Sequence, residues 1–402
     1  MFCLPYAGGG ASAYTGLLHQ LTDLTVIPIQ LPGRENRIAE PPTFTIGEIA
    51  DEIAPATDAP YILYGHSMGA RLAFEVAREL RRRGLPAPLR LYVGGAHPPH
   101  RKVPLAATAD LPDDAFIDQL VRRAGALPEL KHVPELRELM LPVLRADFAW
   151  IKHYRYAPEP PIDVPVVAFT GADDGEVGAA EMLGWARHTT AGFRLRTLRG
   201  GHLFVKDRPA ELAALITADL DGRYPPPEPD EVHIWMDQRP GHASHERVLR
   251  HYDGRTAVST GDADGLALVA VAQEREGQAV GIAVTRSGPS AAESAELSAA
   301  EREQIEDAAE EDRQWLASRA VTAKRALMAA DGEGFDPALA GFPDLADPGP
   351  WRAQGGPGLD RLARWQVVHL PLHTSRGEAL GAVAVPYDRV RLRFDMPAEQ
   401  AG

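Results

Sequence analysis

A serine between two glycines, at a predicted corner between a strand and a helix, constrains this chain more than any other feature. The corner is Tyr64–Ala70, which carries the pattern Gly-x-Ser-x-Gly around Ser67. The apolar run Pro60–Leu63 before it predicts a buried strand, and the helical spacing of apolar residues in Arg71–Leu80 predicts a helix. A sharp corner of this kind needs the two glycines and raises the serine hydroxyl to the positive end of the helix. Ser67 is therefore predicted to be a nucleophile, in preference to an incidental serine in a glycine-rich turn.

Strand-like runs alternate with helical patterns over the first 220 residues. This alternation predicts a parallel, doubly wound α/β sheet. The predicted strands are Phe2–Leu4, Leu24–Ile29, Pro60–Leu63, Leu89–Gly95, Val164–Gly171 and Phe193–Leu198, and further helices are predicted near Ser12–Leu21 and Ile46–Ala54. A long helical insert, about Leu111–Tyr156, follows a central strand, where it could form a lid above the nucleophile.

A serine nucleophile requires a base, and the base requires an orienting acid. In hydrolases with this corner the acid follows the serine in the chain and the histidine follows the acid. His202 lies on a glycine loop after the last of these strands, while Asp173 and Asp174 follow the strand that ends at Gly171. Asp174 is the preferred acid because it lies in a G-x-x-D-x-x-V arrangement, and Asp173 is expected to bind its own backbone in the turn. The predicted catalytic residues are Ser67, Asp174 and His202.

The glycine loop Pro5–Ala11 is predicted to supply part of an oxyanion hole. Such a hole needs two backbone N–H groups, one from the residue after the nucleophile and one from a loop after an early strand. Met68 and Ala7 occupy these positions. A phosphate-binding loop is the competing interpretation, but no lysine follows the glycines as that loop requires.

Composition narrows the class of protein. The chain has 402 residues, 45% of them hydrophobic, which suggests two domains with cores of their own. Its net charge of −14 makes nucleic acid and anionic membranes poor partners. Cys3 is the single cysteine, so no intramolecular disulfide is expected and a reducing, cytoplasmic location fits. No apolar run approaches the length of a membrane span, and the first residues lack the order of a signal peptide.

A second domain is predicted after a proline-rich linker at residues 221–231. One strongly charged helix is expected at about Ala299–Ala330, and Asp344–Gly358 is expected to be a mobile loop. Strand-like runs on both sides of this helix predict a smaller α+β domain over residues 232–402. They are Val232–Trp235, Leu266–Val271, Ala279–Val284, Gln366–Leu370 and Ala379–Val385.

Five segments of the first 220 residues together match one known family: Leu4–Gly9, Gln30–Arg37, Gly65–Ala70, Gly171–Asp174 and Gly200–Phe204. On these segments, residues 1–220 resemble the type II thioesterases of non-ribosomal peptide and polyketide synthesis. The resemblance implies an α/β-hydrolase fold, no cofactor, and hydrolysis of acyl groups from the phosphopantetheine arm of a carrier protein. The family usually has more residues before its first glycine loop, so an edge strand is missing or the start is truncated. Gly94–His100 matches a family motif loosely, and its role is open.

Segments of the C-terminal half match a second family more weakly: Val258–Asp262 with Gly265–Ala272, Val280–Thr285 and Val321–Gly334. On these segments, the C-terminal half resembles an Sfp-type phosphopantetheinyl transferase. The resemblance implies a Mg²⁺ site made of carboxylates, but Ala283, Thr285 and Arg325 stand at the acidic positions, Thr260 replaces a histidine and Ala329 a lysine. Mg²⁺ prefers hard oxygen ligands, which these residues do not provide. We therefore expect no metal site and an inactive domain, kept for structure or for docking a carrier protein.

The remaining basic residues of the third segment, Lys324 and Arg325, are expected to be solvated on a helix surface, although they could still meet a phosphate. The leading interpretation of the chain is a carrier-protein thioester hydrolase with a transferase-like appendage. The same serine could instead serve cyclisation, acyl transfer or hydrolysis of a small ester. A bifunctional thioesterase and transferase, or a scaffold that binds carriers, is the third possibility, and the intact Ser67, Asp174 and His202 argue against a pure scaffold.

Overall fold

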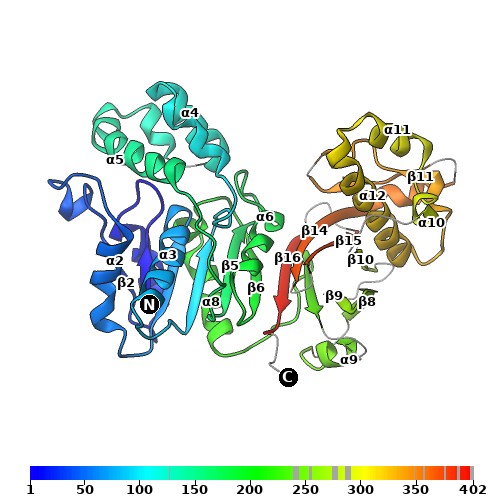
Figure 1. Ribbon diagram of the computed structural model, residues 1–402, viewed down its shortest axis with the longest axis horizontal. Coiled ribbons are helices and arrows are strands. Elements are labelled where there is room, and N and C mark those ends of the chain that lie inside the picture. Colours follow the sequence, from blue (N-terminus) through cyan, green and yellow to red (C-terminus); the bar gives the residue numbers. More distant parts are fainter. Residues whose placement is uncertain are drawn as a thin grey trace. The chain divides into compact units, whose positions relative to one another are not determined.

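The structure is a computed structural model of the 402-residue chain (Figure 1). It describes residues 1–125, 127–238, 244–252, 256–273, 279–285, 291–347, 349–355, 358–374, 377–386 and 390–398. The chain divides into two compact units. The first unit is Met1–Arg223, joined by Ala398, and the second unit is Tyr224–Pro397.

The first unit contains a parallel sheet with the strand order β2-β1-β3-β4-β5-β6. Its strands are β1 Phe2–Leu4, β2 Ile27–Pro28, β3 Ile62–His66, β4 Arg90–Gly94, β5 Val166–Gly171 and β6 Phe193–Leu198. The parallel α/β sheet predicted from the sequence is therefore confirmed. The strand predicted at 24–29 is wrong in length: only Ile27 and Pro28 pair with β1, at the sheet edge. Pro28 has no N–H to donate, so an edge position suits it.

Helices cover both faces of this sheet. Side chains of α1 and α8 join alternate residues of the strands, among them Tyr64 and Phe169, in one buried cluster. No residue of α3 belongs to that cluster, and α3 instead packs on β1, β3 and β4. The helices of the unit are α1 Thr15–Gln20, α2 Ile46–Ile53, α3 Met68–Arg82, α4 Asp113–Ala124, α5 Pro134–His153, α6 Ala179–Leu183, α7 Phe204–Asp207 and α8 Pro209–Leu220.

The helical insert lies between β4 and β5. It consists of the 3₁₀ turns Pro104–Asp110 and Pro128–Lys131 together with α4 and α5. Figure 1 shows α4 and α5 as a pair beyond one end of the sheet. Exposed ion pairs fasten the insert, such as Arg145 with Asp113 at 2.6 Å. We refer to this insert as the lid.

The second unit combines antiparallel and parallel strand pairs with a long helix. One run of strands has the order β16-β7-β9-β8, and a separate antiparallel sheet has the order β10-β15-β14-β12. The strands are β7 Glu231–Asp237, β8 Thr256–Ala263, β9 Leu266–Gln273, β10 Gly281–Thr285, β11 Ala340–Gly341, β12 Trp351–Arg352, β13 Gln354–Gly355, β14 Gln366–Thr374, β15 Gly377–Val385 and β16 Arg391–Met396. The helices are α9 Ser244–Leu249, α10 Ala291–Ser294, α11 Ala299–Asp307 and α12 Glu310–Asp331, and α12 packs on β10 and β15.

Two expectations for this unit are wrong. The single helix predicted at 299–330 is divided into α11 and α12, because Ala308 and Ala309 adopt extended backbone angles. Three acidic residues then open α12, where the helix dipole favours negative charge. The segment 344–358 is not simply a loop, since it contains β12 and β13 and buries Trp351 against Phe342. Residues 348, 356 and 357 of that segment lie outside the described residues.

Across the described ranges, none of the helices combines the length and the apolar character that a membrane crossing requires.

Candidate active site

Ser67 lies between the end of β3 and the start of α3, with a backbone φ of 54° and ψ of −115°. A non-glycine residue in such a region costs about 1–3 kcal/mol, which is typical of functional sites. Both flanking glycines are required: a Cβ on Gly65 would lie 2.0 Å from the carbonyl oxygen of Gly69, and one on Gly69 would lie 2.0 Å from that of Leu4. The Ser67 N–H donates to the Gly94 carbonyl at 2.7 Å, which ties the corner to β4.

The structure brings His202 and Asp174 to Ser67. His202 Nε2 lies 3.0 Å from Ser67 Oγ, and His202 Nδ1 lies 2.8 Å from Asp174 Oδ2. Asp174 comes from the loop after β5 and His202 from the loop after β6, so both loops open at the carboxyl ends of the strands, as Ser67 does. Asp173 is exposed, and its backbone N–H donates to the Gly200 carbonyl at 2.9 Å.

Asp174 is held in its ionised form. Its second oxygen, Oδ1, accepts the backbone N–H groups of Glu176 at 2.8 Å and Val177 at 3.1 Å. Burial alone would raise the pKa of Asp174, but His202 and these two N–H groups outweigh it and hold the pKa below its ordinary value. A carboxylate at Nδ1 requires the histidine proton on that nitrogen, so Nε2 is left to accept the proton of Ser67.

His66, a residue of the corner motif without a predicted role, supports the His202 loop. Its Nε2 lies 2.7 Å from the carbonyl oxygen of His202, and its Nδ1 lies 3.3 Å from the Tyr64 hydroxyl. Burial, and then the neighbouring His202, lowers the pKa of His66 to about 3. The neutral ring therefore donates from Nε2, because a carbonyl can only accept. The sequence offered no signal for this contact, which joins residues 136 positions apart.

The two predicted oxyanion-hole residues lie on segments next to Ser67. Met68 is the first residue of α3, so its N–H has no acceptor within the helix. Ala7 belongs to the turn after β1, which the Gly9 N–H closes on the Tyr6 carbonyl at 2.8 Å. Leu4 pairs with Gly65 in the sheet, so the turn leaves the sheet beside the corner. The role of both N–H groups stays a prediction.

Ser67 and His202 open into a pocket of about 390 Å³, open mouth included. Its walls come from α3, the loops after β4 and β5, and the lid. The apolar lining residues are Met68, Ala96, Val103, Leu105, Phe148, Ile151 and Val177. Phe148 and Ile151 belong to α5, so the lid contributes directly to the space beside the nucleophile.

Three polar side chains of this pocket were not predicted: Arg71, His97 and Glu176. His97 lies in the segment 94–100, whose role the sequence left open. Its Nε2 is buried without a hydrogen-bond partner among the described residues, and it lies 3.7 Å from Glu176 Oε1. Glu176 also pairs with Arg123 of α4 at 2.9 Å. The lining of the pocket is therefore mainly apolar, and Arg71, His97 and Glu176 are its polar members besides Ser67 and His202.

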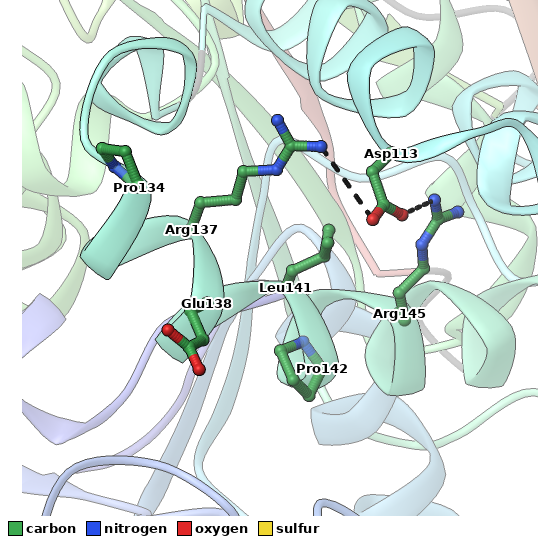
Figure 2. Close-up of a pocket in the computed structure, with 7 residues that line it drawn as sticks. All are labelled: Asp113, Pro134, Arg137, Glu138, Leu141, Pro142 and Arg145. Atoms are coloured by element: carbon green, nitrogen blue, oxygen red, sulfur yellow. Dashed lines mark hydrogen bonds and ion pairs between the residues drawn. The ribbon is translucent and has the colours of Figure 1, made fainter.

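A second pocket lies on the lid between α4 and α5, and it includes none of the three predicted catalytic residues. Figure 2 shows Arg137 and Arg145 directed toward Asp113 at its edge. The two guanidinium groups lie 3.9 and 2.6 Å from the carboxylate, respectively. Arg137 and Arg145 of this pocket are thus paired with Asp113 within the lid.

In the second unit the expectation for Lys324 is wrong. Lys324 is fully buried instead of solvated, and its Nζ contacts Glu301 Oε2 at 2.5 Å and the carbonyls of Glu296 and Pro337 at 2.9 Å. Arg325 pairs with Glu293 and Glu296, each at 2.8 Å.

The structure also shows the burial or contacts of the other residues that were compared with the transferase family. Thr285 Oγ1 lies 2.8 Å from Thr322 Oγ1, Ala283 is buried, and Thr260 and Ala329 are exposed. Among the described residues, no group of three or more His, Cys, Asp or Glu side chains is arranged to hold a metal ion.

Comparison with known proteins assigns the first unit to a family. The model of the thioesterase domain family matches residues 1–220. The gramicidin S biosynthesis protein GrsT of Aneurinibacillus migulanus is 37% identical over 228 residues, which are 55% of this chain and 88% of GrsT.

Two solved structures resemble the same part of the chain. The thioesterase RedJ from the prodiginine pathway of Streptomyces coelicolor is 38% identical with a TM-score of 0.50, covering 54% of this chain and 84% of RedJ. ClbQ from the colibactin NRPS/PKS pathway is 27% identical with a TM-score of 0.50, covering 55% of this chain and 96% of ClbQ. Over residues 1–220, this chain belongs to the thioesterase family.

Proposed function

We propose that the first unit hydrolyses acyl or peptidyl thioesters on the phosphopantetheine arm of a carrier protein, in non-ribosomal peptide or polyketide synthesis. The hydrogen-bonded series Asp174–His202–Ser67 carries this proposal. Family membership supports thioester hydrolysis, and the pathways named for GrsT, RedJ and ClbQ support the biosynthetic setting.

In the proposed reaction, Ser67 Oγ attacks the thioester carbonyl while His202 Nε2 takes its proton. The carbonyl oxygen becomes an oxyanion, which the N–H groups of Ala7 and Met68 stabilise. The carbon–sulfur bond then breaks, and His202 returns the proton to the departing thiolate. A water molecule, deprotonated by the same histidine, then attacks the acyl-serine carbonyl. The bond from the acyl carbon to Ser67 Oγ breaks, His202 returns the proton to Oγ, and a free acid leaves. Asp174 remains ionised throughout and holds the tautomer of His202.

The test is acyl release from a purified acyl-carrier protein, followed by intact-protein mass spectrometry. The wild-type chain should remove the acyl mass and yield a free acid. Ser67→Ala should retain its melting temperature and lose release by several orders of magnitude, because the triad acts as a unit. Release by Ser67→Ala within a few-fold of wild type would contradict the proposal. A ring or an ester product in place of the acid would assign the same serine to cyclisation or acyl transfer.

For the rest of the chain we propose a linker at 221–231 and a transferase-like domain at 232–402 that is catalytically inactive. The residues at the acidic positions, Ala283, Thr285 and Arg325, support inactivity because they offer Mg²⁺ no carboxylate. The burial of Lys324 against Glu301 supports it further, since that amine is already neutralised. This domain would serve the structure of the chain or the docking of a carrier protein.

A further inference from the structure

A buried ion pair joins the lid to the glycine loop. Asp147, in the middle of α5, forms a two-pronged pair with Arg34: Nη1 lies 2.8 Å from Oδ2 and Nη2 lies 2.9 Å from Oδ1. The two side chains are 0% and 5% exposed, respectively. The lid ion pairs Lys152–Asp110 and Arg145–Asp113, by contrast, are at least partly exposed. Those two pairs hold α5 to other parts of the lid, whereas the buried pair joins α5 to Arg34 in the segment after β2. Burying this pair carries a desolvation cost.

Both members of this pair also bind the backbone of the glycine loop. Asp147 Oδ2 accepts the N–H of Gly8 at 2.7 Å, and Arg34 Nη1 donates to the carbonyl of Gly9 at 3.1 Å. The side chain of Leu144, one turn before Asp147, lies so close that a Cβ on Gly8 would be 2.6 Å from its Cδ2. The loop is thus held by α5 from one side and by Arg34 from the other.

The anchored atoms belong to the turn that carries the Ala7 N–H. This N–H and the Tyr6 carbonyl share one peptide plane, and the Gly9 N–H bonds that carbonyl at 2.8 Å. Gly8 has a φ of +78°, a left-handed conformation that glycine adopts readily. Because glycine is also free to leave this conformation, the turn needs contacts from other segments to hold it. Holding Gly8 and Gly9 in place therefore sets the direction of the Ala7 N–H.

The segment after β2 also holds the glycine loop through hydrogen bonds of its own. Gln30 accepts the Ala11 N–H at 2.7 Å and donates to the Arg34 carbonyl at 3.0 Å, which links the loop to the backbone that presents Arg34. Glu35 accepts the Ser12 hydroxyl at 2.6 Å.

We propose that Asp147 is a positioning residue for the oxyanion hole: through Arg34 and Gly8 it fixes the turn that aims the Ala7 N–H at the reacting carbonyl. The lid helix is then part of the catalytic geometry as well as a wall of the pocket. The inference rests on the proposed function, since it requires an oxyanion at Ser67.

The experiment measures two quantities on the full chain with Asp147→Asn. The first is kcat and KM for a small soluble ester, p-nitrophenyl acetate, which does not need carrier docking. The second is inhibition by phenylboronic acid, whose tetrahedral adduct on a serine mimics the oxyanion. Because a displaced oxyanion donor weakens only the charged state, kcat should fall about 10- to 100-fold, boronate affinity should fall in parallel, and KM should change little. Rates are expressed per folded molecule, with folding checked by circular dichroism and melting temperature.

The matched control is Lys152→Met, which removes an exposed ion pair of the same helix and should leave both readouts unchanged. If Asp147→Asn does not fold, Arg34→Lys takes its place, because it keeps the charge but loses the two-pronged contact. A folded variant with wild-type kcat and boronate affinity, whatever its melting temperature, would overturn the inference. Failure of the proposed function looks different: Ser67→Ala would then remain active, and the wild type would not bind the boronate.

Discussion

Asp173 and Asp174 are adjacent in the chain, yet only Asp174 reaches His202 within the first unit. We predict that Asp174→Asn lowers kcat by roughly three to four orders of magnitude, because an amide donor favours the wrong tautomer of the histidine. Asp173→Asn, the matched control on the exposed side of the turn, should stay near wild type. Steady-state kinetics on an acyl-carrier substrate decide between them, and the reverse order of damage would show the assignment to be inverted.

The carboxylate of Asp174 should also make the stability of the first unit depend on pH. Its pKa lies below the ordinary value in the folded state, so the unfolded chain binds its proton first as the pH falls. The stabilisation that ionised Asp174 gives is therefore complete at pH values above the ordinary pKa of aspartate, and it is lost as the pH falls toward the lowered pKa of the folded state. We predict that the unfolding free-energy difference between wild type and Asp174→Asn is largest near neutral pH and shrinks in acid. Urea unfolding at a series of pH values measures it, and a difference that grows in acid would contradict the prediction.

At the scale of elements, the lid combines two properties. Phe148 and Ile151 of α5 line the pocket beside Ser67, while Asp147 of the same helix contacts the glycine loop. If our proposal for Asp147 holds, moving α5 would alter both access to Ser67 and the direction of the Ala7 N–H, whereas holding α5 in place should restrict access only.

This distinction gives a prediction for a cross-linked lid. The rings of Trp150 on α5 and Phe44 are 5.8 Å apart, and the single natural cysteine, Cys3, is buried. Cysteines at these two positions, joined by a short bis-maleimide, should slow release from a carrier protein more than hydrolysis of p-nitrophenyl acetate, since only the larger substrate needs the lid to open. Each single-cysteine variant treated with the same reagent serves as control. Equal slowing of both substrates would argue against an access role.

At the scale of the whole molecule, our proposal gives the second unit no catalytic role. We predict that the full chain, supplied with coenzyme A and Mg²⁺, does not convert an apo carrier protein to its holo form. The reason is that Ala283, Thr285 and Arg325 stand where the transferase family that this half resembles has carboxylates. Mg²⁺ should also leave the melting temperature unchanged, as a ligand stabilises only a state that binds it. An active transferase assayed on the same carrier is the positive control, and detectable holo carrier from this chain would overturn the inactive assignment.

Local sequence patterns were enough to predict the corner at Ser67 and the parallel sheet. A Cβ on Gly65 would collide with Gly69, four residues away in the chain, so Gly-x-Ser-x-Gly with its flanks already predicts the turn. Short apolar runs separated by helical patterns likewise predict parallel strands. The chain order of Ser67, Asp174 and His202 predicts which loops meet, because parallel strands end at one edge of the sheet.

Only the tertiary structure decided which distant side chains meet and which are buried. Arg34 and Asp147 lie 113 positions apart, and His66 supports a carbonyl 136 positions away. The helical pattern predicted Lys324 on the surface, but its amine is buried and contacts Glu301 and two backbone carbonyls. The physical reason is that helical spacing and strand alternation depend on the backbone repeat of nearby residues. Burial and long-range pairing depend instead on how whole elements pack, which no local pattern encodes.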